Sequence, residues 1–476
     1  MKIIIYTALI FFVLQGTSCE SFVEVDAPKE RLITKTVFNN NETAISAMTG
    51  LYANMMQIGF PLSYNISLYT GLYSDELEYK QNSVPVQSLY KYSLNEKDAL
   101  TNTLWSNGYN FIYQSNSIIE GLKRSTEITA SLKSQLLGEA LFFRAFWHFY
   151  LCNLYGDIPL VTSTNYQENS KLPRTSAQKV FDQIELDLLS AKTLLSPKYV
   201  SANSVDESAD RIRVNVFTCA ALLSRLYLFQ EKWQKAETEC TDIINSGLYS
   251  LEKVGNVFKR KSSEPILQLE LPQGAINNSF EANYFTIKAK PSLTSTFRST
   301  SITGTLLEAF EATDLRRINW IGTYTDASLI PNVKYFFPSK YKSTASPADE
   351  YTVLFRLAET YLIRAEARTQ LNNLSDAIKD LDQTRKRANI NLIGDISPNI
   401  GQNALLDSIF RERQRELFCE WGIRWLDIRR SISSDDLMKT IAARKGIVWS
   451  PNWSAWPIPL NDILNNRNLI QNEGYN

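Results

Sequence analysis

The sequence predicts a mostly α-helical protein, a tetratricopeptide-like helical solenoid (an α-α superhelix) that carries a loop- and hairpin-rich insertion. Two observations favour this fold class. Apolar residues recur with the 3.6-residue period of an amphipathic helix through the first half and the end of the 476-residue chain. Between about residues 262 and 349 this period gives way to alternating apolar residues and to stretches rich in Asn, Ser, Thr and Pro, which are typical of strands and loops.

Residues 1–18 are interpreted as an export signal. Lys2 precedes the apolar run from Ile3 to Leu14, which is too short to span a bilayer and matches the core of a signal peptide. Small residues and then Cys19 follow, the arrangement at which a bacterial lipoprotein is cleaved and acylated. We expect the mature chain to start at Cys19 and to be held on a membrane by lipid. The alternative is an ordinary secreted protein in which Cys19 is incidental.

The rest of the chain is expected to form one domain. We expect residues 19–40 to be a lipid-anchored N-terminal segment and residues 41–476 to be a single domain, with the irregular insertion at about 262–349. No later segment is long and apolar enough to cross a membrane.

A buried central helix is predicted at Gly138–Leu154, because this segment is apolar on every side and ends before Gly156 and Pro159. His148, the only histidine, is interpreted as a packed core residue. Arg144 on the same helix needs a buried acceptor or carboxylate and is interpreted as structural.

One helical hairpin is predicted near the C-terminus. Leu354–Ala365 carries a single apolar stripe with helical spacing. A turn at Asn372 and Asn373 follows, and Ser375 can cap the second helix.

A second hairpin is predicted from Ala220, through a turn near Glu231 and Lys232, to a stop at Gly247. Small alanines where the helices cross, and an aromatic residue entering the second helix, resemble tetratricopeptide-type repeats of about 34 residues. Two such hairpins far apart in the sequence imply a solenoid interrupted by insertions.

Aromatic residues gather in two stretches that we expect to be irregular. One runs from Phe60 to Tyr92, and the other is the insertion itself. Loops on a rigid scaffold are where binding usually resides, so these stretches are the candidates for a recognition surface.

Charge and cysteine usage exclude several classes of function. Lys+Arg and Asp+Glu both total 50, so no global positive field would draw the protein to nucleic acid. Apart from Cys19, the cysteines have no CxxC spacing, which disfavours metal clusters and redox dithiols; they are Cys152, Cys219, Cys240 and Cys419. Cys219 and Cys240 could form a disulfide if their helices pair, or remain buried free thiols.

A charged cluster lies in the segment from Arg411 to Arg430. Glu412, Glu416 and Glu420 recur every four residues, with about as many arginines around them. Aligned carboxylates could be a general acid and base, or metal ligands. The number of arginines favours a lattice of ion pairs that locks adjacent helices together.

At these residues the chain resembles the SusD/RagB-like outer-membrane lipoproteins of Bacteroidetes. The family's closing signature, E-R-x-x-E-L-F-x-E-W-G-x-R-W-x-D-x-x-R, is matched from Glu412 to Arg430. Further similar segments occur in the family's order along essentially the whole chain: the C-x-x-F-x-D/E-x-x-x-P start at Cys19–Pro28, EALFFRA at Glu139–Ala145, YGDIPL at Tyr155–Leu160, RLAETYLIRAEA at Arg356–Ala367, P-I-P at Pro457–Pro459 and the Q-N-x-G-Y ending at Gln471–Tyr475.

The resemblance implies a tetratricopeptide-like frame and a lipoprotein at the outer face of the outer membrane. It implies a partner, a TonB-dependent transporter of the SusC type, to which a captured glycan, or in some members a peptide, is passed. Family members are binders, so no catalytic residue and no cofactor is implied.

The binding residues are predicted from the chemistry of sugars, which need rings to stack on and polar groups to hydrogen-bond. From the two aromatic stretches we expect ligand contacts at Tyr69, Tyr73, Asp75, Asn283, Tyr284, Trp320 and Tyr324. Trp320 is the first choice for a stacking platform; the alternative is that it plugs the base of the insertion.

Two other functions remain open. One is a peptide-binding lipoprotein with the same frame. The other is a two-carboxylate glycosidase, for which Asp75 with Glu78, or Glu311 with Asp314, could be drawn as the pair, although no spacing sets the separation that such a pair needs. A single histidine disfavours Ser-His-Asp, Cys-His and multi-histidine zinc sites, and no nucleotide-binding loop is present. We therefore expect no enzyme and no cofactor, and the sequence gives no metal-ligating residues, although whether a metal ion is bound stays open.

Overall fold

The computed structural model describes residues 37–57, 62–79, 84–271, 279–291, 300–328, 330–344 and 349–475. Cys19 and the predicted export signal lie outside the described residues, so lipid attachment stays a prediction. Among the helices that are described, none has the length and apolar character needed to cross a bilayer.

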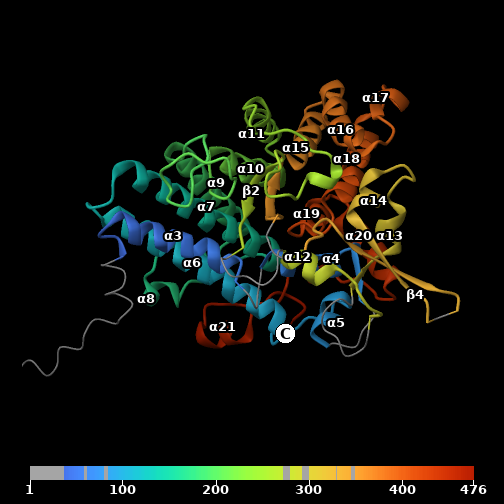
Figure 1. The fold of residues 1–476 in the computed structure, drawn as a ribbon. Helices are drawn as coiled ribbons and strands as arrows, with labels where there is room; N and C mark the ends of the chain where they lie inside the picture. Colours follow the sequence, from blue (N-terminus) through green and yellow to red (C-terminus); the bar gives the residue numbers. More distant parts are fainter. Residues whose placement is uncertain are drawn as a thin grey trace, which may run out of the picture.

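The frame of the molecule is a row of helices in which each packs against the next (Figure 1). In order along the row, these helices are α3 (Asn41–Met55), α6 (Ala99–Arg124), α7 (Ala130–Tyr155), α9 (Ala177–Leu194), α10 (Val216–Phe229), α11 (Trp233–Asn245), α15 (Leu357–Gln370), α16 (Leu374–Ala388) and α18 (Gln402–Leu417). Helix α11 packs directly on α15, although residues 246–356 separate them in sequence. The predicted solenoid with an interruption between its two hairpins is therefore confirmed.

The turns of the two hairpins fall where the sequence predicts them. Glu231 and Asn372 adopt positive φ angles of 55° and 60°, which reverse the chain between the paired helices. Gly247 follows α11 with a φ of 69°, a conformation that glycine adopts at little cost.

Two predicted helix starts are wrong. The apolar stripe predicts a helix from Leu354, but Thr352–Arg356 is strand β6, and helix α15 begins only at Leu357. A continuous apolar run is typical of a buried strand and of a buried helix alike. Here the segment pairs with β2 (Pro265–Leu269) and therefore forms a strand. Ser375 does not cap α16, because Asn373 occupies the N-cap position and accepts the first helical hydrogen bond from Ala377 N at 3.1 Å.

Helix α7 is the buried centre of the frame, as predicted. Every residue from Gly138 to Tyr155 is buried, and the helix ends at Gly156 with a φ of 77°. Arg144 finds the buried carboxylate it needs in Asp187, to which Nε and Nη2 donate at 2.7 and 2.6 Å. His148 is fully buried, and burial lowers its pKa to about 3, so the imidazole is a neutral core group.

Shorter elements pack around this frame and link its parts. Before the interruption they are α4 (Leu62–Tyr73), β1 (Leu77–Tyr79), α5 (Val84–Tyr90) and α8 (Tyr166–Asn169). Within it they are η2 (Val254–Asn256), β2, α12 (Phe280–Phe285), β3 (Thr300–Ile302), α13 (Gly304–Glu308), α14 (Leu315–Trp320), β4 (Ile321–Asp326), β5 (Val333–Pro338) and β6. After α16 they are α17 (Ile393–Ile396), α19 (Ile423–Arg430), α20 (Ser434–Arg444), η3 (Pro451–Ser454) and α21 (Leu460–Asn465).

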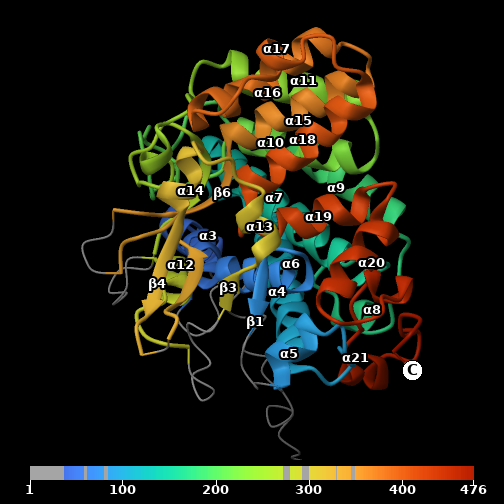
Figure 2. The same ribbon diagram turned by 90° about the vertical axis from the view of Figure 1, so that its right-hand side faces the viewer.

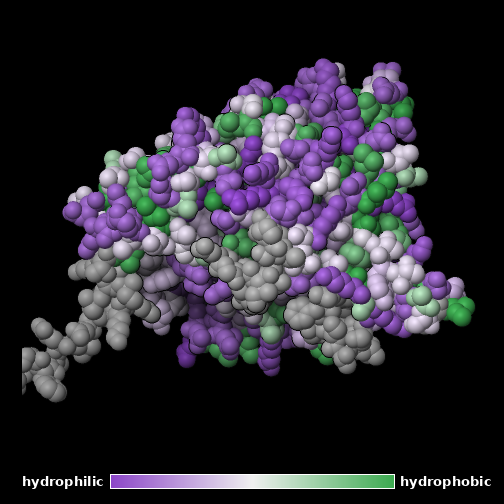
Figure 3. Space-filling view, in the orientation of Figure 1, coloured by the Kyte–Doolittle hydropathy of each residue, from purple (hydrophilic) through white to green (hydrophobic). Residues whose placement is uncertain are grey.

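The strands form three antiparallel pairs, β1 with β3, β2 with β6 and β4 with β5. Every residue of β2 and β6 is buried, so this pair joins the interruption to the core. The β4–β5 hairpin projects from the body (Figures 1 and 2), and its tip is hydrophobic (Figure 3), with Ile330 99 % exposed. The expectation that the stretch from Phe60 to Tyr92 is irregular is wrong for most of its described residues, which are helical in α4 and α5.

The cluster of Glu412, Glu416 and Glu420 is a buried ion-pair lattice, as predicted. Arg316 Nη1 donates to Glu412 at 2.6 Å and to Glu416 at 2.8 Å, and all three side chains are inaccessible to solvent. Arg356 donates to Glu420 at 2.8 Å. The lattice thus joins the insertion, through Arg316, to the end of the solenoid formed by α15, α16 and α18.

The helix that carries this lattice is shorter than the four-residue spacing suggests. Helix α18 ends at Leu417, and Glu420 lies in the following turn, where Cys419, Trp421 and Gly422 have φ angles of 53°, 47° and 73°. Glu420 still reaches the lattice, through Arg356 and Lys340. The prediction that Glu420 lies on the same helix face as Glu412 and Glu416 is therefore wrong, whereas the prediction that it has a structural role is confirmed.

Electrostatics keep these carboxyl groups ionised despite burial. Burial alone would raise the pKa of Glu412, but the nearby guanidinium groups of Arg316 and Arg415 outweigh it and hold the pKa at about 2. The pKa of Glu416 lies well below its ordinary value for the same reason, with Arg387, Arg356 and Arg316 around it.

Cys152, Cys219, Cys240 and Cys419 are buried free thiols, so Cys219 and Cys240 form no disulfide.

We predict that Glu416→Ala lowers the free energy of unfolding by about 3–5 kcal/mol, because it leaves buried guanidinium groups without their carboxylate. Chemical denaturation followed by circular dichroism measures this. Asp407→Ala is the matched control, since Asp407 lies on the same helix in an ion pair with Arg411 whose side chains are both more than 70 % exposed. Equal midpoints for the two variants would show that the lattice is not a stabilising element.

Candidate functional site

The structure brings the two predicted aromatic stretches together on one side of the frame. Helix α12 packs on α4, strand β1 pairs with β3, and β3 packs on β5. In Figure 2 these elements lie next to one another, below helices α15, α16 and α18 of the solenoid. Segments separated by more than 200 residues therefore share one surface region.

A tyrosine cluster, defined here as Tyr64, Tyr69, Tyr79 and Tyr284, is the centre of this region. The rings of Tyr64 on α4 and Tyr284 on α12 stack with centroids 4.5 Å apart and an interplanar angle of 22°. Tyr64 is half-buried, whereas the other three members are buried. A supported ring with some exposed surface is suited to stacking against a flat apolar face.

The hydroxyl groups of Tyr64, Tyr69 and Tyr284 are neutral at physiological pH. Burial raises the pKa of Tyr64, and burial together with the proximity of Tyr64 raises the pKa values of Tyr69 and Tyr284 further. Each hydroxyl therefore keeps its proton and has the capacity both to donate and to accept a hydrogen bond.

Three buried hydroxyl groups on the β1–β3 pair lack a hydrogen-bond partner within the described part of the chain. They belong to Tyr79, Thr300 and Ser301, and Tyr79 faces Thr300 across the ladder. Leaving a buried polar group unpaired costs about 1–3 kcal/mol, so stability alone does not explain them. Unpaired hydroxyl groups beside stacked rings are a feature expected of a site for a polar ligand.

A second aromatic pair lies on the β4–β5 hairpin. Tyr324 and Tyr335 face each other across the strands with ring centroids 6.3 Å apart, and both are half-buried. Lys290, which follows α12, is 3.2 Å from Asp326 at the end of β4, so an ion pair ties this hairpin to the α12 segment. Asn283, also predicted as a contact, is half-buried on α12 next to Tyr284.

Tyr73 and Asp75 have structural partners instead. Tyr73 is fully buried and donates a hydrogen bond from its hydroxyl to Trp453 O at 2.8 Å. Both oxygens of Asp75 accept from Arg424, at 2.8 and 2.7 Å, and one also accepts from Gln414 at 3.1 Å. The predicted ligand contacts at these two residues are not supported by their positions.

Trp320 is a core residue in this structure. Its side chain has no exposed surface, and its Nε1 donates to Val254 O at 2.8 Å. Lys340, Arg356 and Arg387 lie within 6 Å of its ring, so it forms one wall of the ion-pair lattice. The alternative weighed from the sequence, that it plugs the base of the insertion, fits this geometry, and stacking of a ligand on this ring does not.

Three of the four carboxylates that could be drawn as glycosidase pairs are used in ion pairs. Asp75 is held by Arg424, Asp314 by Arg316, and Glu311 lies 3.3 Å from Arg385. No group of three or more potential metal ligands occurs among the residues that the structure describes. The arrangement around the tyrosine cluster thus offers stacking and hydrogen bonding rather than acid-base chemistry.

Comparison with known proteins decides the family. The model described as "SusD family" matches residues 284–475, and the model described as "Starch-binding associating with outer membrane" matches residues 21–228. The chain belongs to the SusD/RagB-like family.

A relative along the full length and a second one over a third of the chain support this assignment. SusD-like protein P25 of Formosa agariphila is 24 % identical over 538 residues, covering 100 % of this chain and 98 % of the relative. Starch-binding protein SusD of Bacteroides thetaiotaomicron is 34 % identical over 160 residues, which cover 33 % of this chain and 27 % of that protein.

Solved structures share the fold of this SusD-like chain. A SusD superfamily protein from Bacteroides vulgatus superimposes with a TM-score of 0.78 at 19 % identity, covering 92 % of this chain and 100 % of that one. A protein described as SusD-like carbohydrate binding, also from Bacteroides vulgatus, gives a TM-score of 0.72 at 20 % identity, covering 91 % and 98 %.

Sequence reasoning did not select Tyr64, Tyr79 and Tyr335 as site residues of this SusD-like protein. Tyr64 opens the same tyrosine-rich stretch that supplied Tyr69, so composition alone could have included it. Its stacking partner Tyr284 is 220 residues away, and only the fold shows that the two rings meet.

We predict that Glu76→Gln stabilises the protein relative to the parent, and increasingly so from pH 5 to pH 8. Burial and then the neighbouring Asp75 raise the pKa of Glu76 from 4.5 to about 8, so the folded state holds this proton more tightly than the unfolded chain. The parent therefore loses stability as pH rises between these values, and the glutamine variant does not. Melting temperatures across this range measure the difference, with the exposed Glu308→Gln on α13 as the control. A difference that stays constant with pH would contradict the prediction.

We predict that Trp320→Ala lowers the free energy of unfolding by about 3–5 kcal/mol, because it removes a fully buried ring. Trp320→Phe keeps an aromatic ring and should lose much less. Denaturation midpoints test both variants. If Trp320→Ala were as stable as the parent and yet failed to bind ligand, the core assignment of Trp320 would be wrong.

Proposed function

We propose that this SusD-like protein is a surface-exposed glycan-binding lipoprotein that captures oligosaccharides and delivers them to a TonB-dependent outer-membrane transporter of the SusC type. The tyrosine cluster, with the Tyr324–Tyr335 pair beside it, is the proposed site of capture. The protein acts as a binder and not as an enzyme, and it needs no cofactor.

The single observation that carries the proposal is the stack of Tyr64 on Tyr284. Sugars present an apolar face, which packs on an aromatic ring, and an edge of hydroxyl groups, which both donate and accept hydrogen bonds. The half-buried ring of Tyr64 supplies the first, while the neutral tyrosine hydroxyls and the half-buried Asn283 supply the second.

The family and its relatives support the same class of ligand. The model that matches residues 21–228 is described as starch-binding and as associating with the outer membrane, and one relative is named as a starch-binding protein. The ion pairs of Asp75, Asp314 and Glu311 leave neither candidate glycosidase pair free for acid-base work, which supports binding without hydrolysis.

Anchoring is proposed to run through the N-terminal segment. Residues 1–18 would be removed on export, and residues 19–40 would connect an acylated Cys19 to helix α3, which begins at Asn41. The domain that follows would then face the exterior, where the tyrosine cluster meets its ligand.

We predict that Tyr64→Ala melts within a few degrees of the parent and binds its glycan roughly thirtyfold more weakly, equivalent to about 2 kcal/mol, because the stacking surface is lost. Calorimetry with maltoheptaose and with a panel of neutral and acidic polysaccharides identifies a binding glycan and measures this loss. Tyr113→Ala is the matched control, since Tyr113 is a 45 % exposed tyrosine on helix α6. A parent that binds peptides and no glycan would contradict the proposal.

We predict that Cys19→Ala releases the protein in soluble form, because the lipid anchor is then absent. Fractionation followed by a high-salt wash distinguishes this from peripheral attachment. The variant remaining in the membrane fraction after the wash would rule out anchoring through Cys19.

A further inference from the structure

A separate pocket lies on the helical frame, among α9, α10 and α11. It has a volume of about 330 Å³, at the lower end of the range for small-molecule sites. Its walls are described residues only: Lys192, Val216, Phe217, Ala220, Asp242, Asn245 and Ser246. None of the predicted ligand contacts and no member of the tyrosine cluster belongs to this set.

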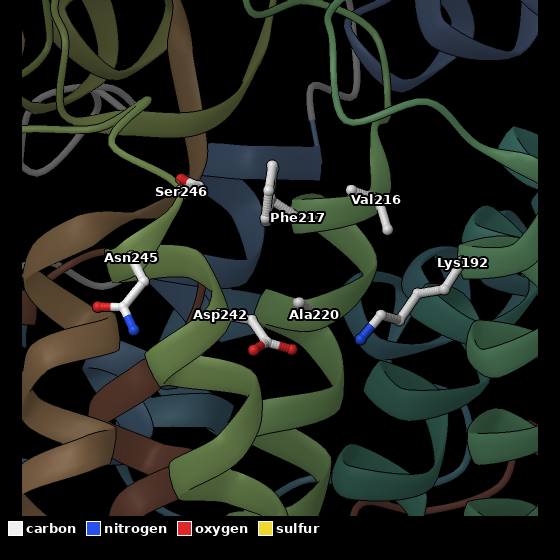
Figure 4. Close-up of a pocket in the computed structure, with 7 residues that line it drawn as sticks. All are labelled: Lys192, Val216, Phe217, Ala220, Asp242, Asn245 and Ser246. Carbon is white, nitrogen blue, oxygen red and sulfur yellow. The ribbon is translucent and has the colours of Figure 1, made fainter.

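One part of the pocket is apolar. Val216, Phe217 and Ala220 come from the first turns of α10, and Figure 4 shows Phe217 between Ser246 and Val216. Phe217 is half-buried, and the ring of Tyr249 contacts it edge to face, with centroids 6.0 Å apart and an interplanar angle of 85°. This packing holds the ring in place and leaves part of its surface accessible.

Polar groups of both kinds face this apolar wall. Asp242 and Asn245, on α11, are exposed; within the described residues the Asp242 carboxylate has no ion pair, and the Asn245 side chain makes no hydrogen bond. Lys192 reaches in from α9 (Figure 4), and its Nζ donates to Glu239 at 2.6 Å, which leaves two of its three N–H groups for other acceptors. The pocket thus presents an acceptor at Asp242, donors at Lys192, and both at Asn245.

Charge and hydrogen-bonding capacity together select one class of ligand. A cationic group would leave the free N–H groups of Lys192 without an acceptor, whereas an anionic group would be repelled by Asp242 and by Glu239, the ion-pair partner of Lys192. A neutral ring with several hydroxyl groups satisfies donors and acceptors alike, and its apolar face packs on Phe217.

We propose that this pocket is a second carbohydrate site, which holds one neutral sugar residue against Phe217 with hydroxyl groups hydrogen-bonded to Asp242, Asn245 and Lys192. The inference rests on the proposed function in that the ligand class is the same, but the site is distinct from the tyrosine cluster. This pocket on the solenoid would bind either the terminal sugar of a glycan or a sugar of a second glycan.

The test uses saturation-transfer NMR titrations with methyl glycosides of glucose, galactose and mannose, on the full mature chain. We expect at least one of them to bind, and Asp242→Ala to weaken this binding about tenfold through loss of a charge-assisted hydrogen bond. Phe217→Leu, which keeps the pocket apolar without the ring, should weaken it severalfold. Both variants should melt like the parent, because Asp242 is exposed and leucine fills part of the space of Phe217.

Tyr64→Ala separates this site from the tyrosine cluster. Residual glycoside binding in Tyr64→Ala that is then lost on adding Asp242→Ala supports the inference. Glycoside binding that Tyr64→Ala abolishes, and that Asp242→Ala and Phe217→Leu leave unchanged, overturns the second site while the proposed function stands. Preferential binding of N-acetyl-lysine amide or glucuronic acid over the neutral glycosides, or no glycoside binding at all, also overturns the inference.

Discussion

The buried lattice of ion pairs around Glu412, Glu416 and Glu420 is the interaction on which the rest of the structure depends. It joins Arg316 of the insertion to Arg356 at the start of α15 and to helix α18, so that three segments far apart in sequence meet in one network. Removing one partner from such a network leaves another charge buried with fewer counter-charges, which is strongly destabilising. The position of the insertion on the solenoid, and hence of α12 beside α4 and of β3 beside β1, follows from it.

The residues that stabilise the fold differ from the residues that are proposed to contact the ligand. Trp320, Tyr73 and Asp75 are bound into the scaffold, whereas Tyr64, Tyr324 and Tyr335 remain partly accessible at its edge. A scaffold that holds a ring rigidly reduces the entropy lost when a ligand stacks on it, so binding gains from packing that the ligand never touches. The unpaired hydroxyls of Tyr79 and Thr300 lie at this boundary, where a cost in stability is compatible with a gain in binding.

Much of the fold could be predicted from the sequence because helical periodicity is local. The hairpin turns at Glu231 and Asn372, the buried helix α7 and the structural role of Glu416 all depend on patterns within a few turns of helix. The start of α15 could not be predicted in this way, since β6 becomes a strand only by pairing with the distant β2. Trp320 follows Arg316 and Arg317 closely in the sequence, which suggests a position at the surface. Only the fold shows that a distant carboxylate pairs with Arg316 in the core. For the candidate site, the sequence predicts the two aromatic stretches that contribute to it. It does not predict that Tyr64 stacks on Tyr284, which only the fold shows.

The central claim is that a glycan binds where α4, α12 and the β4–β5 hairpin meet. Hydrogen–deuterium exchange of the full chain, with and without a glycan that calorimetry shows to bind, tests it most directly. We expect slower exchange in residues 62–79, 279–291 and 321–338 on binding, with no change in the α15–α16 hairpin at 357–388. Protection confined to the solenoid helices, with none in these three segments, would contradict it.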